Sequence, residues 1–276
     1  MKPKIISIIG GNGKMGSKFA HEFHKRGFEV LIADADTKLT NEEVARIGDV
    51  IIVTVPIRDT EAVIKSIMPV VKKGSMVTDF TSVKIKPMDA MIQEVRDDIE
   101  IIGGHPLFGP TTDFKKQNFI ICNEQGGSYT DWYINFLKSL GLNVLEMTKE
   151  EHDKNMAVIQ CLTHFSALSL GSTLEKLHYN LEVGESIATP VYLMRLYGVG
   201  RILAQDADLY TDMQMYNPFA KEVAIKYKES VDELFQSVDI SDENKFNKIF
   251  SKSKKYFGNM ATRSMEITDK LIKTLS

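Results

Sequence analysis

The stretch that decides the fold reads IISIIGGNGKMG and covers residues 5–16. Its first part, Ile5–Ile9, is short, apolar and rich in β-branched residues, which is typical of a buried strand in a parallel sheet. Glycines follow at residues 10, 11, 13 and 16, and an amphipathic segment begins at Lys14. A strand, a glycine-rich turn and a helix in this order predict the first βα unit of an α/β domain.

Gly11, Gly13 and Gly16 have the spacing GxGxxG, which binds dinucleotides where it joins a strand to a helix. Gly11 would allow the tight turn, Gly13 would let a pyrophosphate approach the backbone, and the helix N-terminus would offer its unpaired N–H groups. Asp34 follows about 20 residues on, where a carboxylate accepts from ribose hydroxyls and repels a 2′-phosphate. We expect NAD rather than NADP; an ordinary glycine-rich turn is the alternative. Candidate cofactor contacts are Gly11, Gly13, Lys14, Met15, Gly16, Asp34, Pro56 and Ser82.

The first half of the chain alternates β-branched runs with amphipathic segments, the pattern of a parallel sheet covered by helices. Expected strands are 4–9, 28–33, 49–55, 75–80, 99–103, 118–122 and 143–147, and expected helices are 14–26, 60–71, 87–96 and 129–140. Only a short polar stretch, residues 34–43, follows the second strand. The crossover helix there is therefore expected to be truncated.

The character of the chain changes near Thr148. Thr148 and Glu151 have the spacing of a capping box, which predicts the start of a long helix. Strand signals then stop, and helical periodicity continues over residues 149–176, 191–204, 218–238 and 243–275. We expect two domains: an α/β domain with a mostly parallel sheet over residues 1–147, and an all-helical domain over residues 148–276.

Composition limits the possible functions. The 276 residues include 34 basic and 37 acidic side chains and no long basic run, so no nucleic-acid partner is expected. Cys122 and Cys161 form no CxxC pair and no metal-ligand cluster, so neither a disulfide framework nor a metal site is expected. The apolar run Ile5–Ile9 is too short for a signal sequence, and no apolar run approaches the ~18 residues that span a bilayer. A cytoplasmic protein without a membrane partner is expected.

Two segments at expected strand ends carry side chains suited to chemistry. Ser82 and Lys84 lie in DFTSVK, residues 79–84, and His105 lies in GGHPLFGP, residues 103–110. Open α/β sheets bind ligands at the carboxyl ends of their strands, and an imidazole held there can accept a proton. The alternatives are a helix cap for Ser82, a solvated Lys84 and a structural His105.

The helical half supplies further candidates. In EEHDKNMAVIQCLTHF, residues 150–165, His164 lies about 120° around the helix from His152, so the two side chains do not share a face. His164 is the better ligand candidate, with a core histidine as the alternative, and His152 is interpreted as a structural polar residue. Arg201, in VGRILAQD, either pairs with an acid such as Asp206 or holds an anionic ligand through its planar fork.

Taken together, GGNGKMG, DFTSVK, GGHPLFGP, EEHDKNMAVIQCLTHF and VGRILAQDADLY, in this order and at these spacings, resemble the prephenate dehydrogenase family of tyrosine biosynthesis. The resemblance extends from about residue 5 to the C-terminus. It implies a Rossmann-type NAD-binding domain followed by a helical domain that forms a homodimer, with the active site in the cleft between them. It also implies NAD-dependent oxidative decarboxylation of prephenate to 4-hydroxyphenylpyruvate.

The resemblance further implies roles for individual residues. His105 would be catalytic and accept the hydrogen bond of the substrate's 4-hydroxyl, while Ser82 would help orient that group and the nicotinamide. Arg201 would hold the ring carboxylate, and His164 and Lys84 would help bind the substrate.

Three alternatives stay open at this point. An arogenate dehydrogenase would act on a substrate with an alanyl instead of a pyruvyl side chain. A β-hydroxyacid dehydrogenase shares the two-domain layout, but its GxGxxxKxxxN-type motif is absent from the first long helix. An NAD-sensing binding protein without catalysis would have no need of His105, Ser82 and Arg201 together.

Overall fold

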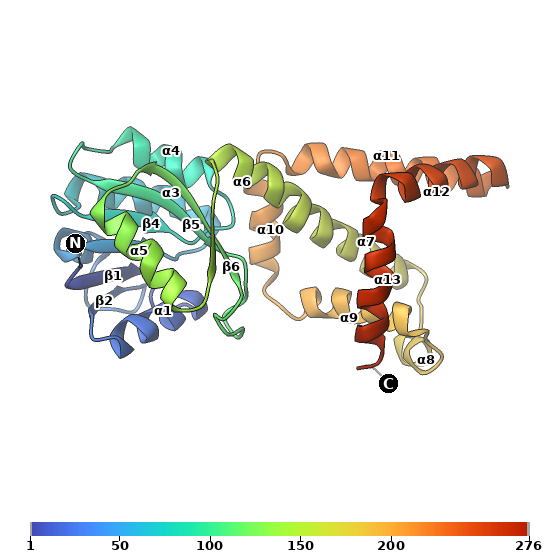
Figure 1. The fold of residues 1–276 in the computed structure, drawn as a ribbon, viewed down its shortest axis with the longest axis horizontal. Coiled ribbons are helices and arrows are strands. Elements are labelled where there is room, and N and C mark those ends of the chain that lie inside the picture. The colour runs from blue at the N-terminus through green and yellow to red at the C-terminus, as the bar shows by residue number, and fades with distance from the viewer. Residues whose placement is uncertain (1, 275–276) are drawn as a thin grey trace. The chain divides into compact units, whose positions relative to one another are not determined.

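The computed structural model describes residues 2–274. The chain folds into two compact units, Met1–Ala157 with Thr211–Pro218 and Val158–Tyr210 with Phe219–Ser276. The first unit contains the whole sheet, and the second is built of helices (Figure 1). The division that the sequence places between residues 147 and 148 stays a prediction.

A seven-stranded sheet forms the centre of the first unit. Its strands are β1 (Ile5–Ile9), β2 (Glu29–Ala33), β3 (Val50–Val53), β4 (Met76–Asp79), β5 (Glu100–Pro106), β6 (Asn118–Gln125) and β7 (Asn143–Glu146). They lie in the order β2-β1-β3-β4-β5-β6-β7, and every neighbouring pair is parallel except β5 with β6. The expected mostly parallel sheet is confirmed. Because β2 and β3 flank β1 on opposite sides, the winding reverses at the carboxyl end of β1, where open α/β sheets bind ligands.

Helices cover both faces of this sheet, which explains why its strands are apolar along their length. Ile8 of β1 packs in one core with Phe23, and the next residue, Ile9, packs in a second core with Ile64. The helices that alternate with the strands are α1 (Lys14–Lys25), α2 (Asn41–Ile47), α3 (Ile57–Ile67), the 3₁₀ turn η1 (Met68–Val70), α4 (Ile85–Gln93) and α5 (Ser128–Ser139). The crossover helix α2 has only seven residues, so the expected truncation is confirmed.

A continuous helical run leads from the first unit into the second. It consists of α6 (Lys149–Met156), one π-helical segment η2 (Ala157–Leu162) and α7 (Thr163–Lys176). The capping box that starts it is confirmed: Glu151 N–H donates to the Thr148 hydroxyl at 3.1 Å, and Thr148 N–H donates to the Glu151 carboxylate at 2.9 Å. The unit assignment changes after Ala157, the first residue of the π segment.

The remaining helices differ in detail from the sequence-based expectation. They are α8 (Leu181–Ser186), α9 (Pro190–Leu203), α10 (Ala207–Tyr216), α11 (Ala220–Asp239), α12 (Glu243–Phe257) and α13 (Asn259–Ile272). The expected single helical segment 243–275 is wrong, because Gly258 adopts φ +50° and separates α12 from α13; Leu275 lies outside the described residues. The short helices α8 and α10 were not expected.

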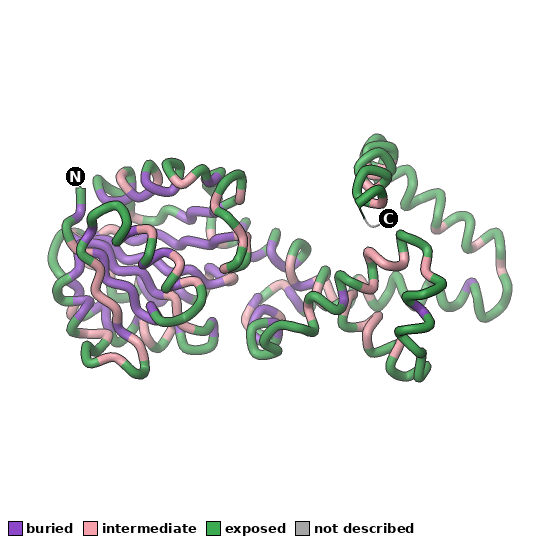
Figure 2. Tube along the Cα trace, turned by 90° about the horizontal axis from the view of Figure 1, so that it is seen from below, coloured by how far each residue is buried: buried purple, intermediate pink, exposed green. Residues whose placement is uncertain are grey.

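Burial differs sharply between the two units (Figure 2). Buried residues gather along the strands. The helices of the second unit expose large apolar side chains such as Phe235 and Phe250. Among the described residues, the run Lys149–Lys176 is long and apolar enough to cross a membrane by length and composition alone, a test that core helices of soluble proteins also pass. The expectation of no membrane partner stays a prediction.

Candidate active site

The glycine-rich turn brings the backbone of β1, α1 and β3 into close contact. Gly10 adopts φ +79°, a left-handed conformation that favours glycine, so Gly10 contributes to the tight turn beside Gly11. A Cβ on Gly11 would lie 2.6 Å from the Ile32 side chain, and one on Gly16 would lie 2.5 Å from the Gly10 carbonyl oxygen. Gly13 is the N-cap of α1 and makes no side-chain cap bond. The first N–H groups of α1 are therefore not covered by a capping side chain.

Two carboxylates lie at the end of β2 beside this turn. Asp34 accepts from the backbone N–H groups of Asn12 at 2.9 Å and Ala35 at 2.8 Å. The side-chain amide of Asn12 donates to the Asp36 carboxylate at 2.7 Å. Asp34 was expected at this place and Asp36 was not, although its position three residues beyond the end of β2 was an available signal.

The other cofactor candidates lie at the same edge of the sheet. Lys14 and Met15 open α1, Pro56 is the N-cap of α3 directly after β3, and the half-buried Ser82 lies in the loop between β4 and α4. His105 is the next-to-last residue of β5. Because β1, β3, β4 and β5 are neighbouring parallel strands, their carboxyl ends meet at one edge.

Lys84 is fully buried and its ammonium is completely engaged. It forms an ion pair and hydrogen bond with Asp79 and donates to the Gly104 carbonyl at 2.8 Å and the Thr81 hydroxyl at 3.3 Å. An ammonium has three N–H donors, so these partners use all of them. The alternative of a solvated Lys84 is wrong. The expected role of Lys84 in substrate binding stays a prediction, and the buried ammonium could act on a substrate only through its neighbours.

The two glycines before His105 make room for this ion pair. A Cβ on Gly103 would lie 2.8 Å from Lys84 Cδ and 2.7 Å from Met88 Sδ. A Cβ on Gly104 would lie 2.8 Å from the Asp79 carbonyl oxygen. The GGH sequence therefore lets β5 pass close to Asp79 and Lys84.

His105 is paired with a second histidine inside the first unit. His105 Nδ1 and His152 Nε2 are 2.8 Å apart, and His152 Nδ1 lies 2.7 Å from the Asp153 carboxylate. His105 is 2% exposed, and His152 and Asp153 are 0% exposed. The interpretation of His152 as a merely structural residue near the helix start overlooked this contact. A His-Asp pair in the first two turns after a capping box was the signal that could have found it.

Burial lowers the pKa of the His105 imidazole well below its ordinary value, and the neighbouring His152 and Lys84 lower it further. Burial also lowers the pKa of His152, although the hydrogen bond to Asp153 opposes this shift. His105 is therefore neutral near pH 7, which is the form that can accept a proton.

The second unit gathers the remaining candidates. His164 of α7 packs edge to face on Tyr210, with ring centroids 4.7 Å apart, and burial lowers the pKa of His164. Burial raises the pKa of Tyr210, and the positive charge of Arg201 opposes that rise. Within the described part of the chain, Arg201 forms no ion pair with Asp206, whose carboxylate accepts the Asp208 N–H at 2.9 Å. The alternative pairing of Arg201 with Asp206 is therefore not found.

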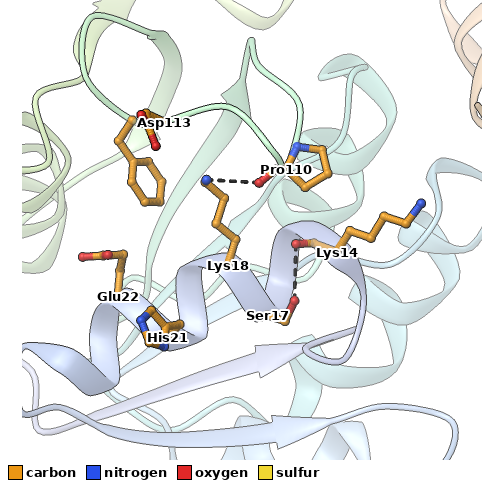
Figure 3. A pocket seen from close by; sticks show the side chains of 8 residues that line it. Lys14, Ser17, Lys18, His21, Glu22, Pro110 and Asp113 are labelled. Carbon is orange, nitrogen blue, oxygen red and sulfur yellow. Dashed lines mark hydrogen bonds between the residues drawn. The ribbon is translucent and has the colours of Figure 1, made fainter. Parts of the chain in front are cut away.

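A pocket of about 430 Å³ lies beside α1 (Figure 3). It is lined by Lys14, Ser17, Lys18, His21, Glu22, Pro110, Asp113 and Phe114. Lys18 Nζ donates to the carbonyl oxygens of Pro110 at 3.1 Å and Thr112 at 2.7 Å and lies 4.5 Å from the Phe114 ring centroid. Lys18 therefore holds the loop between β5 and β6 against α1. Among residues 2–274 no group of three His, Cys, Asp or Glu side chains could hold a metal ion.

Comparisons with known proteins agree with this architecture. Residues 19–145 match the family model described as the nucleotide-binding domain of prephenate dehydrogenase, and residues 148–252 match its dimerization domain. A protein of Methanocaldococcus jannaschii named "Probable arogenate/prephenate dehydrogenase" is 35% identical over 98% of this chain, which spans 65% of that protein's length. The "T-protein" of Haemophilus influenzae is 31% identical over 97% of this chain and 71% of its own length.

A solved structure shares the fold. Prephenate dehydrogenase from Aquifex aeolicus, in complex with hydroxyphenyl propionate and NAD+, superposes with a TM-score of 0.70 at 19% identity, over 97% of this chain and 99% of that one. A mostly parallel sheet with a glycine-rich βα turn and a following helical unit defines a nucleotide-binding α/β protein of the dehydrogenase type. More narrowly, the chain belongs to the prephenate dehydrogenase family, as its motifs indicated.

Replacing Gly103 by alanine should destabilise the first unit, because the new Cβ forces Lys84 and Met88 to shift. Overpacking of this kind costs about 1 to 3 kcal/mol. The matched control is Gly109→Ala, since a Cβ there meets no atom within 4 Å and should change stability by less than about 0.5 kcal/mol. Urea unfolding measures both variants. Equal free energies of unfolding for the two would contradict the proposed close approach.

Stability should fall as the pH drops below the ordinary histidine pKa of about 6.5. His105 and His152 have lowered pKa values in the folded chain, so the unfolded chain binds more protons in this range. Above about pH 6.5 both states hold neutral imidazoles, and these groups add no pH dependence. Urea unfolding at about pH 7.5 and 5.5 tests this. The decrease in the free energy of unfolding between these pH values should be smaller in His105→Asn than in the wild-type protein. An equal decrease in both proteins would contradict the role given to His105.

Proposed function

We propose that this chain is an NAD-dependent dehydrogenase that oxidatively decarboxylates prephenate to 4-hydroxyphenylpyruvate. One observation carries the proposal: a neutral, buried His105 lies at the same sheet edge as the glycine-rich turn and Asp34. A dehydrogenase that oxidises an alcohol carbon needs a group that accepts the hydroxyl proton next to a bound hydride acceptor.

The residues at the glycine-rich turn suit a dinucleotide. Gly13 carries no side chain between α1 and an incoming pyrophosphate, and the α1 N-terminus favours an anion. Asp34 uses two hydrogen bonds and keeps further acceptor capacity for ribose hydroxyls. Asp36 adds a second negative charge that disfavours a 2′-phosphate. A Saccharomyces cerevisiae relative that is 26% identical carries the name "Prephenate dehydrogenase [NADP(+)]", so family membership does not decide between the two cofactors. The proposed preference for NAD rests on Asp34 and Asp36.

In the proposed reaction, His105 accepts the proton of the 4-hydroxyl while hydride leaves the carbon that bears it. Bound NAD supplies the hydride acceptor. The bond between the ring and its carboxylate breaks, carbon dioxide departs, and the electron pair left behind completes the aromatic ring. Ser82 would orient the hydroxyl and the nicotinamide, Arg201 would hold the ring carboxylate, and His164 would contribute to substrate binding.

We also propose that the protein is a homodimer formed through its helical unit. Residues 148–252 match a dimerization domain, and large apolar side chains such as Phe235 and Phe250 are more than half exposed in the single chain. Exposed apolar surface of this kind is typical of an interface.

The direct test follows NADH absorbance with purified protein, NAD or NADP, and either prephenate or arogenate. NADH should form with NAD and prephenate, and His105→Asn should lower kcat about 10² to 10⁴-fold. Faster turnover of arogenate would assign the protein as an arogenate dehydrogenase. Absence of reduction with both substrates and both cofactors would overturn the proposed activity and leave a binding function.

Asp34→Ala should weaken NAD binding and narrow the difference between NAD and NADP, because the ribose loses a charged acceptor. A hydrogen bond to a charged group contributes about 1.5 to 3 kcal/mol, which is roughly 10- to 150-fold in Kd. Titration of both cofactors measures the change. Asp97→Ala, an exposed carboxylate in another loop, is the control. An unchanged cofactor preference would remove Asp34 from the site.

Arg201→Lys should raise the KM for prephenate, because an ammonium cannot reproduce the two parallel hydrogen bonds of a guanidinium. Loss of a partner in a desolvated charge pair costs about 2 to 5 kcal/mol, roughly 30-fold to several thousand-fold in kcat/KM. Arg195→Lys is the matched control, because Arg195 is an arginine of the same helix α9 and is exposed in the single chain as Arg201 is. If only the control variant lost affinity, or neither did, the ring carboxylate would have another partner.

A further inference from the structure

A chain of hydrogen bonds runs from the N-terminus of α4 to His105. Asp153 accepts the Lys84 N–H at 2.7 Å and the Ile85 N–H at 3.0 Å, one on each carboxylate oxygen. Ile85 is the first residue of α4 and Lys84 is its N-cap, so the carboxylate lies where the helix dipole favours negative charge. Asp153 is thus fixed as the acceptor at one end of this series of hydrogen bonds.

The Asp153 backbone is held as well. Its carbonyl oxygen accepts the Asn217 side-chain N–H at 2.9 Å, and Asn217 belongs to the Thr211–Pro218 segment of the same unit. In that segment Asp212 pairs with Arg58 of α3 at 2.8 Å. Asp153 therefore cannot turn away from His152 without breaking contacts on two sides.

These partners set the position of each proton. A carboxylate only accepts, so His152 must carry its proton on Nδ1 and donate it to Asp153. In a neutral imidazole the other nitrogen then accepts, so His152 Nε2 must receive the proton of His105 Nδ1. His105 is left with Nε2 as its unprotonated nitrogen.

We propose that His152, held by Asp153, is a positioning residue that locks His105 in the tautomer whose Nε2 accepts a proton from the substrate. This proposal rests on the proposed function and adds residues to it. The proton moves from the substrate oxygen to His105 Nε2, and the resulting imidazolium keeps its Nδ1–H bond to His152. The other charged groups around the two rings are Lys84 and Asp79, which pair with each other.

A structural role alone would make different predictions. A polar pair that only fills space would leave the His105 tautomer and the pH profile untouched when His152 is replaced by another buried residue. A positioning residue changes both. His152→Gln offers a side-chain oxygen in place of Nε2, whereas His152→Leu offers no acceptor.

The first measurement uses nitrogen-15 labelled histidine and NMR on the substrate-free protein, with His105→Asn to assign the signals. His105 and His152 should both be protonated at Nδ1 and unprotonated at Nε2. A proton on His105 Nε2 in the wild-type protein would overturn the proposal. Because this measurement needs no substrate, it decides the tautomer even if the proposed activity fails.

The second measurement compares steady-state kinetics over pH. His152→Leu should lower kcat about 10- to 100-fold, by analogy with the loss of hydrogen-bond partners that orient metal-binding histidines, with a smaller change in KM. The acid limb of its kcat profile should also shift, because leucine removes the Nε2 atom that accepts the Nδ1–H of His105. His152→Gln should recover most of kcat, and His24→Gln, an exposed histidine of α1, should match wild type. A folded His152→Leu with unchanged kcat and acid limb would overturn the proposal.

Discussion

The buried ion pair between Lys84 and Asp79 is the constraint on which the candidate site depends. Two fully buried charges are costly to desolvate, and their geometry must be maintained by further hydrogen bonds. Lys84 obtains these from Thr81 and from the Gly104 carbonyl, so one ammonium joins the end of β4, the following loop and β5. Ser82 and His105 lie directly beside these anchor points in the chain.

The same pair links the sheet edge that carries the cofactor candidates to the hydrogen bonds between Asp153, His152 and His105. Lys84 is the N-cap of α4, and its N–H donates to Asp153, which in turn fixes His152 against His105. Burial around these charges keeps the pKa of His105 low, so its neutral form persists near pH 7. The neutral imidazole thus follows from how the sheet edge packs, and the glycines of GGH permit the close approach.

Sequence patterns predicted those features that are formed by residues close together in the sequence. The glycine-rich turn and Asp34 follow strands whose type is set by β-branched runs, and the capping box at Thr148 involves residues three apart. The contact of His105 with His152 joins residues 47 apart, so the local His-Asp pattern could single out His152 but could not show which residue it contacts. The family resemblance implied that Lys84 helps to bind substrate, and a solvated lysine was the alternative because lysines are mostly exposed. Its burial depends on Asp79 and Gly104, which only the packed sheet brings together.

A double-mutant cycle on the buried pair tests this account most directly. Asp79→Asn, Lys84→Met and the double variant would be compared with wild type by urea unfolding. Each single variant leaves one charge buried without its partner, which costs about 3 to 5 kcal/mol. The double variant should cost clearly less than the sum, with a coupling energy of about 2 kcal/mol or more. Effects that add to within about 0.5 kcal/mol would show that the pair does not hold the strand ends together, and would contradict the account.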